Sequence, residues 1–211
     1  MILPLDQADI SFLSVGESCA TAHQIRRFTQ SENAFFYDWI ATTDNSFKGI
    51  LTKEGELLQS GNWELADDGD RLLDKANGIR YRHEFPYSDP IIQHVDPAQV
   101  ESKLDAARKK FLYLGGKTIE MISSTQNICL ICYMENASDL TILKKSSEII
   151  TFFGIFNPQI RVVIASNAEV NERISEYPFF IRVNKGITWM GDDQSWDRLF
   201  NIVLSNWAKL T

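Results

Sequence analysis

The strongest constraint in this sequence is a buried strand that leads, through one glycine turn, directly into a helix. The strand is expected over residues 10–15 and ends at Gly16. Ser18 can cap a helix that continues to about Phe28, so Cys19 falls in its first turn. A thiol there lies near unpaired backbone N–H groups and the positive end of the helix dipole, which both favour the thiolate. The stretch predicts a fold that presents a reactive cysteine.

Strand-like and helical segments alternate along the 211 residues. Apolar or alternating runs predict strands near residues 10, 80, 128, 160 and 179, with helices among them. This order is typical of an α/β fold in which a mostly parallel central sheet is flanked by helices in three layers. No linker rich in Pro, Ser or Gly separates two halves, so we predict a single α/β domain over residues 1–211.

Three further expectations concern residues 45–116. Asp96-Pro97 resembles the cap and first residue of a helix, which we expect to end at Gly115-Gly116. Residues 45–58 have the apolar spacing of a helix, and residues 64–77 are acidic and loop-like. The predicted strands near residues 10 and 80 are therefore separated by helices and a polar stretch.

The chain is moderately acidic, with a formal net charge of −7 at pH 7. This charge argues against a nucleic-acid partner. No stretch approaches the roughly 18 apolar residues of a membrane span. The first residues lack the basic flank and long apolar core of a signal peptide. We therefore expect a cytoplasmic protein without a membrane span.

Two of the three cysteines, Cys129 and Cys132, have the spacing of a redox or zinc motif. They lie inside the apolar run of residues 128–134, whereas a redox pair belongs at a helix start and a zinc site needs a second pair of ligands. We predict that both are buried core thiols, which suits a reducing compartment. No metal or redox cofactor is implied.

The three histidines are the candidate bases for Cys19. His23 lies one turn further along the same helix, so contact would be easy, but a base is usually held by a separate element. His83 lies near the end of a predicted strand, which is where sites form in α/β sheets. His94 lies in a loop and is the weakest candidate. We therefore favour His83 as the base.

An acidic side chain could orient the imidazole and stabilise its cation. Asp38 is the main candidate because an acid among aromatic residues needs a polar partner, although it could equally close a turn or cap a helix. The guanidinium groups of Arg26 and Arg27 could bind a carboxylate or phosphate of a substrate, but they could also pair with Asp38 or face solvent. The residues expected to contact a substrate are Ser18, His23, Arg26, Arg27 and Trp39.

Four short motifs carry a resemblance to a known family. They are Ser14-Val-Gly-Glu-Ser-Cys19, Ala22-His-Gln-Ile-Arg-Arg27, Phe36-Tyr-Asp-Trp39 and Arg82-His-Glu-Phe-Pro86. Their order and spacing resemble a bacterial domain family of unknown function whose members are predicted to be papain-like cysteine peptidases. The resemblance implies Cys19 as nucleophile, His83 as base and Asp38 as a third member. It also implies a papain-like α+β fold as the alternative to the α/β fold.

A second resemblance is fainter. Residues 15–18, Val-Gly-Glu-Ser, resemble the Gly-Asp-Ser block of SGNH-type esterases, but the late histidine of those enzymes is absent because none follows His94. The turn into Cys19 also resembles capsule-biosynthesis acetyltransferase-like proteins. We therefore predict a cysteine-nucleophile hydrolase or acyl-transfer enzyme, and the first resemblance implies that it is a papain-like cysteine peptidase. The expected substrate is a peptide or an acyl or carbohydrate compound. The alternatives are an SGNH-like esterase or acetyltransferase acting on carbohydrate, and a non-enzymatic binding module on the same scaffold.

Overall fold

The structure is a computed structural model. It describes residues 10–42, 46–51, 56–66, 69–89, 91, 93–124, 127–175 and 179–210. The chain divides into two compact units. The parallel-sheet unit comprises Met1–Asn33 and Glu120–Thr211, and the antiparallel-sheet unit comprises Ala34–Ile119. The single domain over residues 1–211 stays a prediction.

Four parallel strands form the sheet of the parallel-sheet unit, in the spatial order β1-β8-β9-β10. They are β1 (Ile10–Ser14), β8 (Asn127–Met134), β9 (Arg161–Ser166) and β10 (Phe180–Arg182). The helices of this unit are α1 (Cys19–Thr29), α3 (Asp139–Phe153), α4 (Glu172–Ser175), α5 (Asp193–Asn206) and the short 3-10 helix η4 (Trp207–Lys209). Parallel strands need such crossover connections. The predicted α/β class, a parallel sheet flanked by helices, is confirmed.

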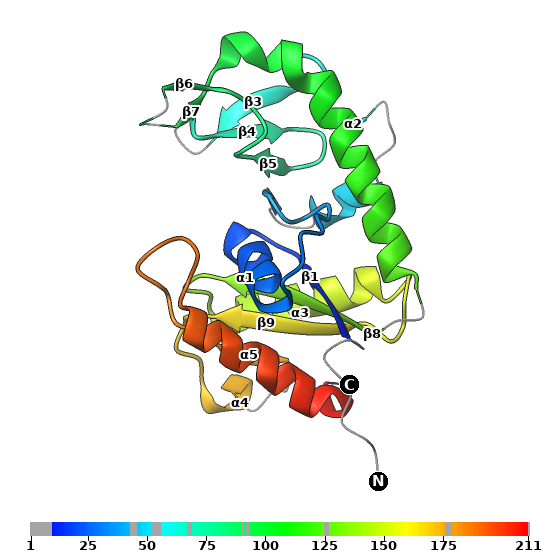
Figure 1. The fold of residues 1–211 in the computed structure, drawn as a ribbon, viewed down its shortest axis with the longest axis vertical. Coiled ribbons are helices and arrows are strands. Elements are labelled where there is room, and N and C mark those ends of the chain that lie inside the picture. The colour runs from blue at the N-terminus through cyan, green and yellow to red at the C-terminus, as the bar shows by residue number, and fades with distance from the viewer. Residues whose placement is uncertain are drawn as a thin grey trace. The chain divides into compact units, whose positions relative to one another are not determined.

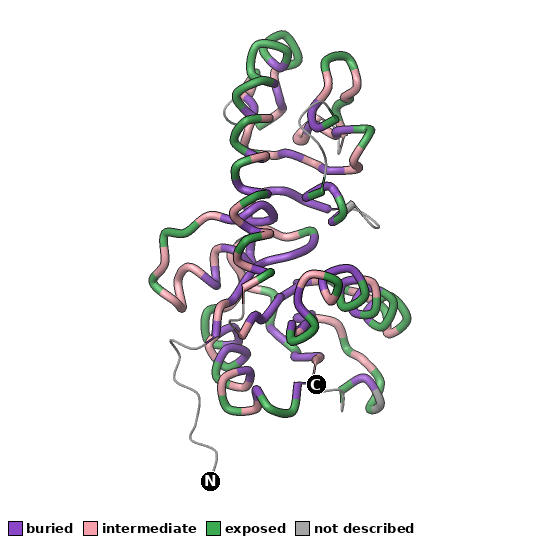
Figure 2. The backbone as a smooth tube through the Cα atoms, turned by 90° about the vertical axis from the view of Figure 1, so that its right-hand side faces the viewer, coloured by how far each residue is buried: buried purple, intermediate pink, exposed green. Residues whose placement is uncertain are grey.

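Alternation along the central strand β8 explains the layers. Cys129, Ile131 and Tyr133 point to one side and join a buried cluster with Trp196 and Phe200 of α5. The residues between them point to the other side. Helices α1 and α5 cover the first face and α3 covers the second (Figure 1). Figure 2 shows the sheet strands buried along most of their length, which explains why β8 is an unbroken apolar run.

The antiparallel-sheet unit pairs four short strands in the order β2-β5-β4-β3. They are β2 (Ile40–Thr42), β3 (Trp63–Ala66), β4 (Arg71–Asp74) and β5 (Ile79–Tyr81). The unit also holds the 3-10 helix η2 (Ser46–Leu51), the paired strands β6 (Tyr87–Asp89) and β7 (His94–Val95), and most of the helix α2 (Pro97–Ile122). The Tyr81 ring packs edge-on against Phe111 of α2, with ring centroids 4.8 Å apart. One face of this sheet is therefore buried on α2.

Two expectations for this unit are wrong. The strand near residue 80 pairs antiparallel with β2 and β4 instead of joining the parallel sheet. Residues 64–77, expected to be a loop, contain β4 and most of β3. These two strands are hard to recognise in the sequence because they are interrupted by polar residues. Each has only four residues, and much of β3 is exposed. Of the helix expected over residues 45–58, residues 46–51 form a 3-10 helix, and residues 56–58 form a turn and bend instead of a helix. Residues 45 and 52–55 lie outside the described residues.

Helix α2 passes through Gly115-Gly116 and ends at Ile122, so the expected stop is also wrong. A Cβ at Gly115 would lie 3.5 Å from the carbonyl oxygen of Ile50 and 3.5 Å from Cδ2 of Phe36. Both distances are ordinary van der Waals contacts, so the helix packs against these two residues at Gly115. Tertiary packing of this kind offsets the roughly 1 kcal/mol by which a glycine weakens a helix interior.

Candidate active site

Cys19 is the first residue of α1, directly after the turn that leaves β1. Gly16 makes this turn with a φ of +115°, and a Cβ there would lie 2.7 Å from Sγ of Cys132. Glycine meets both demands because it tolerates positive φ and has no Cβ. The Ser18 hydroxyl caps α1 by accepting the N–H of Ala20 at 3.2 Å. The turn therefore holds a half-buried thiol at a helix N-terminus, beyond the carboxyl end of β1.

The charge distribution along α1 suits a thiolate at its start. The first turn carries no acidic residue, and the last turn carries Arg26 and Arg27. The helix dipole therefore acts on Cys19 without an opposing carboxylate in that turn. The Ala20 N–H, however, already donates to Ser18. The helix cap and a thiolate at Cys19 would compete for this donor.

The other two thiols are buried core residues, as the sequence predicts. Cys129 and Cys132 are 0% and 1% exposed. Alternation along β8 turns them to opposite faces of the sheet, so they cannot form a disulfide. Burial raises the pKa of the Cys129 thiol far above its usual range and that of Cys132 to about 12. Among the three cysteines, all of which the structure describes, only Cys19 combines partial exposure with a helix N-terminus.

His83 lies in the bend after β5 with only part of its surface exposed to solvent. Its Nδ1 atom is 3.3 Å from the Tyr87 hydroxyl, which donates to the carbonyl oxygen of Arg82 at 2.8 Å. The hydroxyl has one proton and donates it to the Arg82 carbonyl, so it can only accept a hydrogen bond from His83. The hydrogen-bond network therefore places the ring proton of neutral His83 on Nδ1. The Trp39 ring packs edge-on against the imidazole, with centroids 6.2 Å apart. In this tautomer the Nε2 lone pair of neutral His83 can accept a proton.

The pKa of His83 is lowered from its usual value of 6.5. Partial burial is the largest cause, the charges of Arg82 and Arg71 add to it, and the Asp70 carboxylate opposes it. Each cause that lowers the pKa disfavours the imidazolium. The ring is therefore neutral at pH 7, the state in which a histidine can act as a base.

Asp38 is buried in the turn before β2, with 4% of its surface exposed. Its Oδ2 atom accepts the N–H of Phe35 at 2.9 Å, and its own N–H donates to the Phe35 carbonyl at 3.3 Å. The carboxylate therefore closes this turn, which is one of the two roles open from the sequence. The Nδ1 atom of His83 bonds to Tyr87, so an orienting role for Asp38 stays a prediction.

Arg27 ties α1 to α5. Its Nε atom lies 3.3 Å from the Asp193 carboxylate, and its Nη2 atom pairs with Asp197. The buried Gln24 side chain donates to the Asp193 carboxylate and to the Met190 carbonyl, each at 2.8 Å. These contacts give Arg27 a structural role. A substrate contact from Arg27 stays a prediction.

His23 packs edge-on against Trp189, with ring centroids 5.5 Å apart. Trp189 is 60% exposed in the loop between β10 and α5. Neither Trp189 nor Tyr87 is among the residues expected from the sequence. Tyr87 had a usable signal, because it follows His83 by four residues across a proline. Trp189 is far from α1 in sequence and had none.

The predicted site residues are divided between the two units. Ser18, Cys19, His23, Arg26 and Arg27 belong to the parallel-sheet unit. Asp38, Trp39 and His83 belong to the antiparallel-sheet unit. The structure brings Trp39 and His83 together and places His23 one turn from Cys19 on α1. The partnership of Cys19 with His83 stays a prediction.

Comparisons with known proteins find no matching family model, no matching curated protein and no matching solved structure. The resemblance to cysteine peptidases therefore stays a prediction. Within the described part of the chain, no group of three His, Cys, Asp or Glu side chains could hold a metal ion. None of the helices in the same residues is long and apolar enough to cross a membrane.

Proposed function

We propose that this chain is a cytoplasmic thiol-dependent hydrolase or acyltransferase in which Cys19 is the nucleophile. The observation that carries the proposal is the position of Cys19 at the start of α1, after a turn that requires glycine at residue 16. Ligands of parallel α/β sheets bind beyond the carboxyl ends of the strands, where this turn lies. The other two thiols are buried with raised pKa values, so they do not compete as nucleophiles.

The proposal assigns the base to His83. Its Nε2 atom accepts the proton of the Cys19 thiol, and the sulfur attacks a carbonyl carbon of the substrate. The bond to the leaving group then breaks as the imidazolium returns its proton to that group, which leaves a thioester on Cys19. Water or a second acceptor cleaves the thioester and regenerates the thiol. Tyr87 supports this role because it holds the Nδ1 proton of His83.

The sheets support two substrate classes for different reasons. His83 follows an antiparallel strand, as the base does in papain-like enzymes, which favours a peptide substrate. Cys19 follows a strand of an all-parallel sheet, as nucleophiles do in SGNH-like esterases, which favours an acyl or carbohydrate substrate. Saturable binding of coenzyme A would favour acyl transfer, and release of amines from casein would favour peptide hydrolysis.

The test is the rate of alkylation by iodoacetamide as a function of pH. We expect a fast phase in the wild type with a midpoint below the free-thiol value of about 8.5. Cys19→Ser should abolish this phase, whereas Cys129→Ser, the matched control, should leave it intact. An unshifted midpoint in the wild type would refute an activated nucleophile and favour the binding module.

The base is tested with two matched variants. His83→Ala should raise the midpoint of the Cys19 phase, because it removes the neutral imidazole that takes up the thiol proton and then, as the imidazolium, stabilises the thiolate. His23→Ala should leave the midpoint in place. The opposite result would assign the role of base to His23, which lies on the same helix as Cys19.

A further inference from the structure

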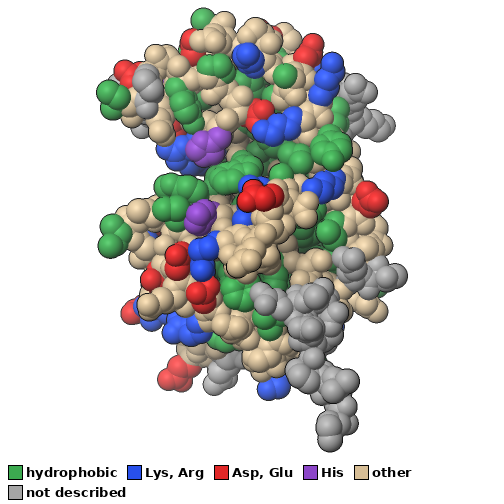
Figure 3. Space-filling view, in the orientation of Figure 1, with side chains coloured by type: hydrophobic (Ala, Val, Ile, Leu, Met, Phe, Trp, Pro, Cys, Tyr) green, Lys and Arg blue, Asp and Glu red, His purple; other side chains and the backbone are tan. Residues whose placement is uncertain are grey.

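The loop between β10 and α5 displays apolar side chains beside α1. Its residues 186–191 are Gly-Ile-Thr-Trp-Met-Gly, which include no charged side chain. Ile187 is fully exposed and Trp189 is 60% exposed. Figure 3 shows hydrophobic side chains on the surface where Figure 1 draws this loop next to α1. Adjacent exposed apolar side chains that include a tryptophan indicate a surface that makes contact with another molecule.

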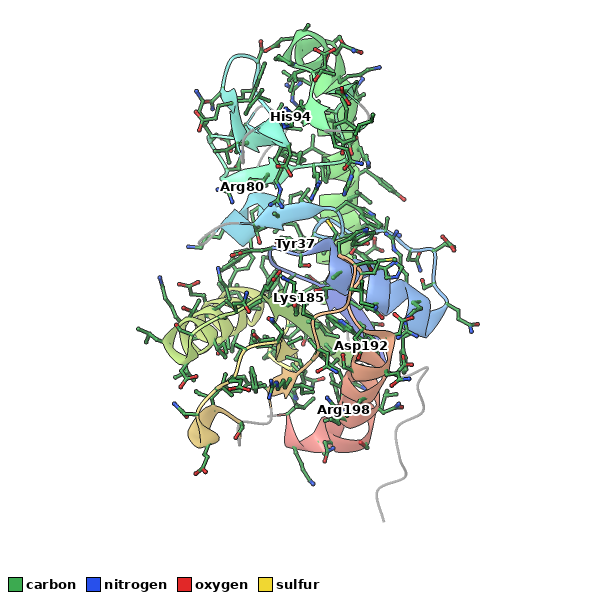
Figure 4. All side chains as sticks on the ribbon, turned by 90° about the vertical axis from the view of Figure 1, so that its left-hand side faces the viewer. Tyr37, Arg80, His94, Lys185, Asp192 and Arg198 are labelled. Carbon is green, nitrogen blue, oxygen red and sulfur yellow. The ribbon has the colours of Figure 1, made fainter. Side chains whose placement is uncertain are left out.

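The two ends of this loop touch each other. A Cβ at Gly186 would lie 2.3 Å from the carbonyl carbon and oxygen of Gly191, so the ends can meet only because residue 186 has no side chain. The Gly191 N–H donates to the Thr188 carbonyl at 3.2 Å. Figure 4 labels Lys185 and Asp192, the residues that flank the loop. The loop backbone is therefore closed at its base before anything binds, which lowers the entropy lost on binding.

Helix α5 places the loop toward the start of α1, because contacts between the two helices advance in the same direction along both. The Gln24 side chain donates to the Asp193 carboxylate at 2.8 Å. About one turn further along both helices, Arg27 pairs with Asp197. The two helices therefore run the same way, as return helices of a parallel sheet do. The loop precedes α5, so it lies toward the end of α1 that carries Cys19.

One aromatic contact links the loop to the face of α1 that carries the thiol. His23 follows Cys19 by four residues, so the two side chains lie on one face of the helix. The Trp189 ring packs edge-on against His23, with centroids 5.5 Å apart and an angle of 67° between the planes. Two rings at this angle form a corner, where a third flat ring can contact the face of one ring and the edge of the other.

We propose that Trp189 and His23 form a specificity subsite that binds an aromatic ring of the substrate of Cys19. The inference rests on the proposed function, because it takes Cys19 as the nucleophile. Aromatic rings pair well in offset and edge-on arrangements, which this corner offers. A sugar or a charged group needs several polar partners, and the loop has one polar side chain, that of Thr188, which accepts the N–H of Met190 at 3.4 Å.

The test compares the rates at which three reagents alkylate Cys19 in the full chain, each divided by its rate with glutathione. N-benzyl iodoacetamide carries an aromatic ring, N-iodoacetylglucosamine carries a sugar ring, and iodoacetamide carries neither. We expect the rate to saturate with concentration for the benzyl reagent alone. Trp189→Ala should lower the benzyl rate relative to the iodoacetamide rate about tenfold, the loss expected when one large apolar contact surface is removed.

A fourth reagent identifies the source of the ring. N-iodoacetyl-phenylalanine amide adds a peptide group to the aromatic ring. Saturation at lower concentration than the benzyl reagent would identify the side chain of a peptide, and saturation at equal concentration would identify an aromatic acyl compound.

Ile155→Ala is the matched control. Ile155 is 78% exposed and lies between the end of α3 and the start of β9. Helix α3 returns from the carboxyl end of β8 to the amino end of β9, so Ile155 lies at the opposite edge of the sheet from Cys19. Ile155→Ala should keep the selectivity of the wild type. If Trp189→Ala fails to fold, Trp189→Leu removes the ring but keeps an apolar side chain, and it should still lower the selectivity.

Three results would overturn the subsite. They are no saturation with the benzyl reagent, equal loss of selectivity in Trp189→Ala and Ile155→Ala, and saturation with the glucosamine reagent without saturation with the benzyl reagent. Failure of the proposed function has a different signature, which is a Cys19 alkylation midpoint at the free-thiol value of about 8.5. A lowered midpoint without aromatic selectivity would therefore remove the subsite and leave the nucleophile.

Discussion

The two units set the surroundings of their proposed catalytic residues by different means. In the parallel-sheet unit the backbone does so, through the Gly16 turn and the N-terminus of α1 beside Cys19. In the antiparallel-sheet unit side chains do so, because Tyr87, Trp39 and nearby arginines surround His83 in a bend. A site built by backbone depends on a few local residues. A site built by side chains depends on contacts that substitution can adjust one at a time.

The largest effect should come from the backbone of the parallel-sheet unit. Gly16→Ala should lower the free energy of unfolding by about 3 kcal/mol for two reasons. The new Cβ would clash with Cys132, and alanine is strained at a positive φ. Urea unfolding measures the change. Gly116→Ala in α2 is the control, since a Cβ there meets nothing within 4 Å, and it should stabilise the chain by up to about 1 kcal/mol. Equal stability of Gly16→Ala and the wild type would refute the backbone requirement.

The next effect tests Asp38 in the antiparallel-sheet unit. Asp38→Ala should cost about 2 kcal/mol in urea unfolding, because the buried N–H of Phe35 loses its acceptor. Asp38→Asn keeps an acceptor oxygen and should cost less than about 1 kcal/mol. If Asp38 only closes the turn, Asp38→Asn leaves the Cys19 alkylation profile unchanged. A raised midpoint in Asp38→Asn would instead give the carboxylate an electrostatic role.

Ser18→Ala compares a cap beside the thiol with a cap elsewhere. It should cost about 1 kcal/mol, as should Ser138→Ala at the start of α3. Only Ser18→Ala frees the Ala20 N–H for the thiolate, so only this variant should lower the midpoint of Cys19 alkylation. Equal midpoints in the two variants would show that the cap does not compete with the thiolate.

The smallest effect concerns the protonation of His83. Because its folded pKa lies below 6.5, its unfolded form binds the proton more readily, and its contribution to stability is lost as the pH falls below that value. Arg82→Gln should raise the pKa of His83 in an NMR titration, since it removes a repelling charge. Arg198→Gln should leave this pKa unchanged. A lower pKa in Arg82→Gln would contradict the assignment of cause.

The sequence predicted the parallel-sheet unit well because its signals are local. The apolar run at residues 128–134, the Gly16 turn and the cap at Ser18 each act within a few residues. In the antiparallel sheet only β5 was expected as a strand, and its pairing was not. The other three strands have three or four residues each, too few for a clear period. The continuation of α2 through Gly115 was not predicted for another reason. Ile50 and Phe36, which pack against the helix there, are distant in sequence.

The sequence by itself determined that the Cys19 thiol lies at a helix N-terminus, because a strand, a glycine and a helix cap are encoded by neighbouring residues. It also determined that Cys129 and Cys132 are core residues, because an apolar strand buries both faces. Only the tertiary structure decided that Tyr87 holds the His83 proton, that Arg27 binds α5, and that Asp70 lies between Arg71 and Arg82. These contacts depend on strand register and helix packing, which arise from the whole chain and not from any one segment.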